Sequence, residues 1–253
     1  MNEAEHNFEA LKNFFQQKLT VMGRDGVIGV AKFQHVYENL MPEQQARLKQ
    51  TSGEQFSGLL KNGSIICIGM AYPESVIDAI DTKLANGTVD KNTWNIYARE
   101  YDALNKALNA TAEEIVQRFG GDAIPPVTGT HVEKVEDYYG KTISHRVVAE
   151  HAGLGWRGKN ELLVNPQFSC ALRFASIVTS LPLPHGKKID TSCGDCTACI
   201  DVCAILKVKS KLPNYRASCM RQIMKLGLEK DVCGRCIKAC YRQSKHTHQF
   251  KLR

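Results

Sequence analysis

The segment Cys193-Gly-Asp-Cys-Thr-Ala-Cys-Ile-Asp-Val-Cys203 carries four of the ten cysteines of the chain, in the spacing C-x2-C-x2-C-x3-C. Bacterial ferredoxins use this spacing, with three thiolates on one iron–sulfur cluster and the fourth on a second cluster. A second segment, Cys233-Gly-Arg-Cys-Ile-Lys-Ala-Cys240, adds three cysteines, and Cys219 lies between the two segments. Two [4Fe–4S] clusters need about eight thiolates, so the sequence predicts a ferredoxin-like segment with two clusters.

Zinc and disulfides are the alternatives for a chain with so many cysteines. A structural zinc ion usually takes two C-x2-C pairs that a longer loop separates, whereas residues 193–203 crowd four sulfurs into one short run. Disulfide frameworks are typical of small secreted domains. This chain has 253 residues, and its polar, acidic start, Met1-Asn-Glu-Ala-Glu-His6, has no signal-peptide pattern. We therefore expect iron–sulfur clusters in a reducing cytoplasm, with zinc as the alternative.

The other two cysteines stand apart from this array. Cys67 lies in the apolar run Ser64-Ile-Ile-Cys-Ile-Gly-Met70, which predicts a buried strand, and Cys170 lies between Ser169 and Ala171. Free cysteine behaves as a small hydrophobic residue. We expect both cysteines to be core residues.

Positive charge is concentrated in the cysteine-rich part of the chain. The net charge is +7, and residues 186–253 carry 15 Lys and Arg against 5 Asp and Glu. Two clusters with their thiolates would neutralise part of this charge. The remainder fits an acidic electron donor, a nucleic-acid backbone or a solvated basic face. No run of 18 apolar residues occurs, so we expect no membrane-spanning segment.

The hydrophobic pattern before residue 185 mixes helices and strands. The predicted helices cover residues 3–21, 97–119 and 142–151, and the predicted strands cover residues 27–31, 65–70, 162–164 and 172–178. Two adjacent prolines and several glycines predict an irregular loop over residues 120–140.

Pro182, Pro184 and Gly186 indicate a boundary just before the first cysteine run. We therefore predict an α+β protein with two domains. An α/β domain would cover residues 1–185, and a mostly helical, ferredoxin-like domain would cover residues 186–253.

The segment Gly153-Leu-Gly-Trp-Arg-Gly158 matches G-x-G-x-x-G, the pattern of dinucleotide-binding loops. That loop follows a strand and opens a helix, so that pyrophosphate meets the helix N-terminus. Here a predicted helix precedes the glycines and a predicted strand follows them. We therefore expect a glycine-capped turn whose backbone lies close to something flat and large, with Trp156 packed beside it.

The segment Ala149-Glu-His-Ala-Gly-Leu-Gly-Trp-Arg-Gly-Lys-Asn160, the run Ser176-Ile-Val-Thr-Ser-Leu-Pro-Leu183 and the cysteine array together resemble the epoxyqueuosine reductase family. The resemblance implies a cobalamin-binding α/β domain joined to a double-cluster ferredoxin domain, an architecture related to that of reductive dehalogenases. It also implies an oxidoreductase in tRNA modification, which reduces epoxyqueuosine in tRNA to queuosine.

The resemblance also implies roles for individual residues. One cluster would be held by Cys193, Cys196, Cys199 and Cys240, and the other, nearer the corrin ring, by Cys203, Cys219, Cys233 and Cys236. The positions that contact the corrin in the family fall on Leu163, Phe174, Arg221, Cys236 and Ile237, each of which fits plain core or surface equally well. No histidine lies in a D-x-H-x-x-G motif, so we expect cobalamin without an axial ligand from the protein.

A reductive deoxygenation also needs a proton donor. The aspartate of the family aligns without gaps with Tyr139, and it aligns with Asp137 only after a two-residue insertion. Nearby cations could lower the pKa of a tyrosine by stabilising phenolate; these are Lys141, Arg146, Arg157 and Lys159. The alternative is that Tyr138 and Tyr139 only line the pocket.

Two further expectations concern the protein as a whole. Full-length members of the family continue into helical repeats that help to hold tRNA, and this sequence ends at Arg253, so we expect a short form. An electron donor of the ferredoxin or flavodoxin type is expected to supply low-potential electrons. The rival hypothesis is a two-cluster electron-transfer protein without catalysis of its own.

Overall fold

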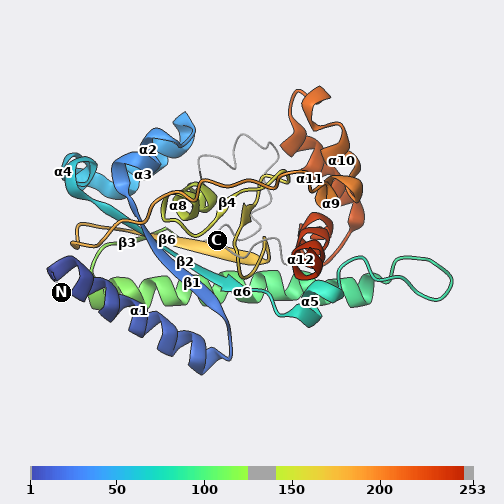
Figure 1. Cartoon of the computed structure of the whole chain (residues 1–253), viewed down its shortest axis with the longest axis horizontal. Coiled ribbons are helices and arrows are strands. Elements are labelled where there is room, and N and C mark those ends of the chain that lie inside the picture. The colour runs from blue at the N-terminus through green and yellow to red at the C-terminus, as the bar shows by residue number, and fades with distance from the viewer. Residues whose placement is uncertain (1, 125–140, 248–253) are drawn as a thin grey trace.

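The structure, a computed structural model, describes residues 2–124 and 141–247. Its centre is a four-stranded sheet in the order β1-β2-β6-β3 (Figure 1). The strands are β1 (Gly26–Lys32), β2 (Ser64–Ala71), β6 (Leu172–Thr179) and β3 (Asp122–Ile124). Each neighbouring pair is antiparallel. The α+β class is therefore confirmed, but the expected α/β arrangement of residues 1–185 is wrong, since no parallel pair occurs among the strands described.

The two faces of the sheet bury different helices. Side chains alternate along a strand, so Ile66 and Ile68 of β2 join one core, and Ile65 and Cys67 join the other. The first core contains α1 (Glu3–Met22) and α6 (Lys91–Phe119). The second contains α8 (His145–His151) and three short helices that the sequence did not predict. These are α2 (Phe33–Glu38), α3 (Pro42–Ser52) and α4 (Phe56–Asn62).

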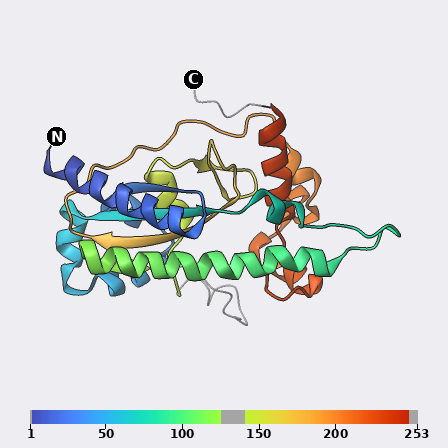
Figure 2. The ribbon, with the colours of Figure 1, turned by 90° about the horizontal axis from the view of Figure 1, so that it is seen from below.

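Helix α6 is the longest described element and runs from the sheet to the cysteine-rich segment (Figure 2). It begins at Lys91 rather than at the predicted Tyr97, because the side chain of Asp90 accepts hydrogen bonds from the backbone amides of Asn92 and Thr93. Its first turns bury Trp94, whose Nε1 donates to the carbonyl oxygen of Cys233 at 2.8 Å. The extra turns therefore connect the sheet to the second cysteine run.

The remaining predicted elements are mostly confirmed. The prediction of a strand around Cys67 holds, since Cys67 is fully buried in β2. The helix predicted from residue 142 begins at His145. The predicted loop over residues 120–140 contains β3 at its start, and residues 125–140 lie outside the described part of the chain.

The cysteine-rich segment is mostly helical, as predicted. Its helices are α9 (Ala198–Asp201), α10 (Ala204–Lys207), α11 (Tyr215–Leu226) and α12 (Arg235–Thr247). It packs closely on the preceding part, because Val232 belongs to the same hydrophobic core as α1 and α6, and α12 lies against α5 (Glu74–Asp78). The division into two domains near residue 185 stays a prediction. In the described ranges, the helices include none with the length and apolar character needed to cross a membrane.

The glycine-rich segment forms the predicted turn after a helix. Gly153 has φ +74°, a conformation that favours glycine. Its amide donates to the carbonyl oxygen of Glu150, and the amide of Leu154 donates to that of Ala149, the pattern of a Schellman C-cap. The short strand β4 (Trp156–Arg157) then pairs with β5 (Leu163–Val164). The backbone therefore turns against its own chain, and the buried Trp156 packs beside it.

Candidate functional site

Four of the eight clustered cysteines surround one small cavity. They are Cys193, Cys196, Cys199 and Cys240, and the wall is completed by Lys159, Asn160, Val164 and Gln243. Three of the four thiols come from the first run, and Cys240 is brought to them by α12. The resemblance implies this same set of four for one cluster, and ligation stays a prediction.

The other four thiols form a second group that interacts electrostatically. Burial raises the pKa of Cys219 to about 11, and the negative charges of Cys203 and Cys233 add to the shift. Burial also raises the pKa of Cys236, with further contributions from Cys233, Cys203 and Cys219. The resemblance implies these four for the second cluster.

A positively charged metal centre would stabilise the thiolate forms of these neighbouring cysteines. Burial raises the pKa of Cys199 to about 11, and the neighbouring thiolates of Cys240 and Cys193 raise it further. Thiolates bind metals in the deprotonated form, so binding releases these protons and removes the mutual repulsion. Among the side chains described, those of residues 2–124 and 141–244, no three His, Cys, Asp or Glu are placed to hold a single metal ion.

Cys240 has the opposite shift. Hydrogen bonds from the thiol of Cys170 and from the hydroxyl of Ser169 lower its pKa. The Ser169 Oγ lies 3.1 Å from the Cys240 Sγ. Cys170 is buried, as predicted. It lies beside Cys240, and it also lines the larger cavity described below.

Lys159 connects the glycine-rich turn to the first cysteine run. Its Nζ donates to the carbonyl oxygen of Gly194 at 2.6 Å and to that of Cys196 at 3.0 Å. The next residue, Asn160, donates from Nδ2 toward the Cys170 Sγ at 3.4 Å. Lys159 therefore supports the loop of the first run, and its predicted role beside Tyr139 stays a prediction, since Tyr139 lies outside the described residues.

A cavity of about 450 Å³ lies between the sheet, α6, α8 and α12. Apart from Cys236, four residues are predicted to contact the corrin. Three of them, Leu163, Phe174 and Ile237, line this cavity. Arg221 does not line it, because it is exposed on α11 and donates to the Ser218 Oγ. Ligand-binding pockets commonly have volumes of about 300–1,000 Å³.

The cavity lies next to the second group of thiols. Ile237 follows Cys236 directly in α12 and lines the cavity. Tyr97 also lines it, and burial raises the pKa of Tyr97, with a smaller contribution from the charge of Cys236. Cys170, which also lines the cavity, lies beside Cys240 of the first group. That the second group is the one nearer the corrin stays a prediction.

The two predicted proton donors, Tyr139 and Asp137, lie outside the described residues, as does Tyr138. Of the cations predicted to act near them, Arg146 and Arg157 line the cavity. Both predictions of the acid stay open.

Known proteins similar to the chain carry the name of the family that its motifs resemble. No family model matches the chain. The epoxyqueuosine reductase of Bacillus cereus is 28% identical to it over 211 residues, which cover 78% of this chain and 52% of that protein. The epoxyqueuosine reductase of Bacillus anthracis is 27% identical over 213 residues, with the same coverage, 78% and 52%. The chain is similar to epoxyqueuosine reductases.

This result confirms the resemblance predicted from the glycine-rich segment and the cysteine array. The chain spans about half the length of the curated epoxyqueuosine reductases that it matches, 52% in both cases. A crystal structure of selenomethionine-labelled epoxyqueuosine reductase overlaps it with a TM-score of 0.45 and 18% identity, over 79% of this chain and 53% of that one.

The residues fit the groups that the resemblance to epoxyqueuosine reductases implies. Soft thiolate donors in two sets of four suit [4Fe–4S] clusters. The large cavity combines apolar walls at Leu163, Phe174 and Ile237 with polar groups, a lining that suits a flat ring with polar edges. His145 also lines the cavity, and its Nδ1 lies 2.8 Å from the Ser176 Oγ.

The sequence did not predict most polar residues of the cavity. Tyr72 follows β2, Tyr97 lies in α6, Arg173 lies in β6 and Arg216 lies in α11. They come from separate elements and belong to no short motif, so spacing alone carried no signal for them. One available signal was position, since Tyr72 is a polar-tipped residue directly after a fully buried strand.

Proposed function

We propose that the chain is an iron–sulfur, cobalamin-dependent oxidoreductase that performs a reductive deoxygenation, with epoxyqueuosine in tRNA as the first candidate substrate. The observation that carries this proposal is the position of Ile237. It lines the large cavity and lies in α12 between Cys236 and Cys240, one thiol from each group of four. The relatives that bear the name epoxyqueuosine reductase support the same reaction.

The eight cysteines are proposed as the ligands of two [4Fe–4S] clusters, in the two groups described above. When bound, the clusters supply single electrons at low potential, and cobalamin supplies a readily reduced cobalt centre. Residues 1–185 are proposed as the corrinoid-binding part and residues 186–253 as the two-cluster part. Leu163, Phe174 and Ile237 would orient the ring and exclude water, and Arg221 is carried over from the resemblance alone.

The proton is proposed to come from Tyr139, with Asp137 as the alternative. Either group would hold the proton on its side-chain oxygen, and both are close in sequence to Thr142, which lines the cavity. General acids act best when their pKa is near the working pH. The cationic side chains of Arg146 and Arg157, which line the cavity, favour ionisation of a neighbouring acid.

Two partners follow from the proposal. A ferredoxin or flavodoxin would deliver electrons to the clusters, and the basic residues of 186–253 suit the acidic surface of such a donor. The same basic charge suits the phosphate backbone of tRNA.

The proposal is tested by anaerobic purification of the chain with cobalamin. We expect about eight irons and eight sulfides per chain and a base-off Co(II) spectrum from bound cobalamin. A chain that binds both clusters but no corrinoid would be the electron-transfer protein instead, and zinc in place of iron would contradict the proposal entirely.

The acid is tested by turnover of a tRNA stem-loop that contains epoxyqueuosine. We expect Tyr139→Phe to lose about a hundredfold or more in turnover, since general acids commonly contribute 10²–10⁴-fold. Tyr138→Phe is the matched control and should keep its activity. Full activity in Tyr139→Phe together with loss in Asp137→Asn would assign the proton to the aspartate.

A further inference from the structure

Positive charge predominates among the charged residues that line the large cavity. Among the described residues that line it, four are arginines, Arg146, Arg157, Arg173 and Arg216, and one is a carboxylate, Glu161. They come from four elements or their flanking loops, with Arg146 in α8, Arg157 in β4, Arg173 in β6 and Arg216 in α11. Tertiary packing therefore brings together cations that are far apart in the sequence.

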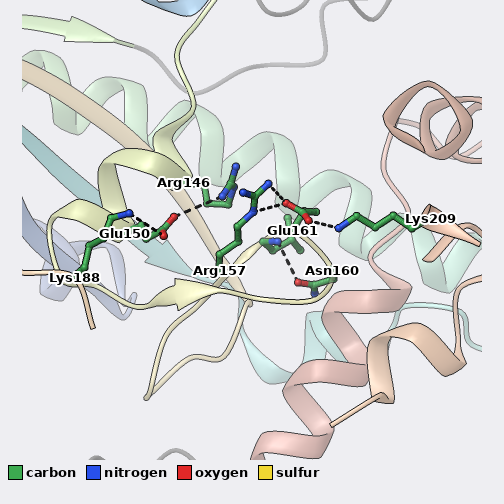
Figure 3. A network of polar contacts seen from close by, with 8 residues as sticks. Arg146, Glu150, Arg157, Asn160, Glu161, Lys188 and Lys209 are labelled. Carbon is green, nitrogen blue, oxygen red and sulfur yellow. Dashed lines mark hydrogen bonds and ion pairs between the residues drawn. The ribbon is translucent and has the colours of Figure 1, made fainter. Parts of the chain in front are cut away.

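The single carboxylate is already neutralised. Glu161 accepts hydrogen bonds from Arg157 and from Lys209, and its side chain is only 14% exposed (Figure 3). Arg157 and Lys209 carry two positive charges, and Glu161 supplies one negative charge between them. Arg173 is held separately, since it donates to the Asn105 Oδ1 at 2.9 Å and lies over the ring of Tyr101.

Arg146 is a largely buried cation of the group. Its side chain is 17% exposed, and it pairs at 3.7 Å with Glu150, which Lys188 also contacts. Burial lowers the pKa of Arg146, and the positive charges of Arg157 and Arg216 lower it further, against opposing contributions from Glu161 and Glu150. Arg157 and Arg216 therefore both lie within electrostatic range of Arg146, and a bound anion would offset the repulsion between these cations.

Arg216 has room to take part in binding. It is exposed, and its ring contact is with Tyr215, which also lines the cavity. Within residues 2–124 and 141–247 it forms no ion pair. Figure 3 shows the ion pair of Arg146 with Glu150 and that of Arg157 with Glu161. Because all three arginines line the cavity, an anion bound there would meet guanidinium groups from α8, β4 and α11.

We propose that Arg146, Arg157 and Arg216 form a binding site for a phosphate group at the mouth of the large cavity. Guanidinium groups donate paired hydrogen bonds that match the geometry of phosphate oxygens. The proposal rests on the proposed function only for the source of the phosphate, which is either the RNA backbone or the nucleotide loop of cobalamin. The site itself is defined by the three arginines.

The site is tested by titrating inorganic phosphate into the anaerobically purified chain, with chloride used to keep the ionic strength constant. We expect saturable binding that Arg216→Gln weakens by about tenfold or more, since a hydrogen bond to a charged group contributes about 1.5–3 kcal/mol. Arg118→Gln is the matched control, because Arg118 is exposed on α6 and does not line the cavity.

Arg146→Gln provides a second variant with the same expected loss, and circular dichroism checks that it is folded. No saturable binding to the unmodified chain, or equal binding by Arg216→Gln and the unmodified chain, would overturn the site. Neither outcome depends on whether the chain binds a corrinoid, so failure of the site and failure of the proposed function are distinguishable.

The source of the phosphate is tested with two further ligands. If cobalamin supplies it, Arg216→Gln weakens binding of cobalamin about tenfold and leaves binding of cobinamide, which lacks the nucleotide loop, unchanged. If RNA supplies it, the loss appears with the tRNA stem-loop and the two corrinoids bind as before. Unchanged binding of all three ligands would overturn the proposed use of the site.

Discussion

The two cysteine runs begin with the same pattern, Cys-Gly-x-Cys, but they are held by the fold in different ways. Gly234 of the second run is buried, and a side chain there would lie 2.8 Å from both Ile80 and Tyr97. Gly194 of the first run is exposed and has no neighbour within 4 Å of the corresponding position. One local sequence pattern therefore serves a packed segment and an open loop.

The contacts around each run follow the same difference. In the second run, Trp94 donates to the carbonyl of Cys233, and Lys238 donates to the carbonyls of Asp78 and Ile80 at 2.8 and 2.7 Å. The first run receives the two hydrogen bonds of Lys159. We infer that the protein positions the second run before any cluster binds, whereas the first run depends on its cluster for order.

The largest expected effects come from removing one ligand of each cluster. Cys199→Ala and Cys236→Ala should each lose one cluster, about four of eight irons, as measured by iron and sulfide analysis. Hydrogen exchange should then accelerate at residues 193–203 in Cys199→Ala, while residues 233–247 stay protected in Cys236→Ala. Equal acceleration of hydrogen exchange in both runs would contradict the inferred difference between them.

Alanine at the two glycines gives the next largest effect. Gly234 has φ +79° and Gly194 has φ +48°, so both variants carry backbone strain. Gly234→Ala also overlaps Ile80 and Tyr97, so it should lower the free energy of unfolding by about 3 kcal/mol, against about 1 kcal/mol for Gly194→Ala. Urea unfolding under anaerobic conditions measures both values, and similar losses would contradict the difference in packing.

Two lysines allow a third, smaller test, because the Nζ of each donates to two backbone carbonyls. Lys238→Met should lower the free energy of unfolding by about 2 kcal/mol, and Lys159→Met, whose bonds are more exposed, by about 1 kcal/mol. Lys159→Met should in addition release iron faster to a chelator. Faster release from Lys238→Met than from Lys159→Met would refute the assignment of Lys159 to the first run.

The smallest expected effect concerns the electronics of one cluster. Ser169 donates to the Sγ of Cys240, and hydrogen bonds to ligand sulfurs raise the reduction potential of a cluster. Ser169→Ala should therefore lower the potential of the cluster that holds Cys240 and leave the other unchanged. Ser218→Ala, on α11, is the control, and redox titration followed by electron paramagnetic resonance distinguishes the two clusters.

Local patterns predicted much of the fold, but they failed where segments are short or polar. The long amphipathic helix at the N-terminus and strands β2 and β6 were predictable because their hydrophobic periods are clear. Helices α2 to α4 were missed because burial against the sheet, rather than a strong period of their own, stabilises them. The antiparallel order of the sheet also depends on long-range pairing, which residue spacing does not encode.

The sequence by itself was enough to predict the candidate chemistry of the protein, because spacing between thiols along a short run constrains which metal centres can bind. It also determined the glycine-capped turn and, through its motifs, the relationship to epoxyqueuosine reductases. Only the tertiary structure brought Cys240 to the first three thiols and gathered arginines from four elements around one cavity. These groupings depend on how α12, α8 and β6 pack, and packing is a property of the whole chain.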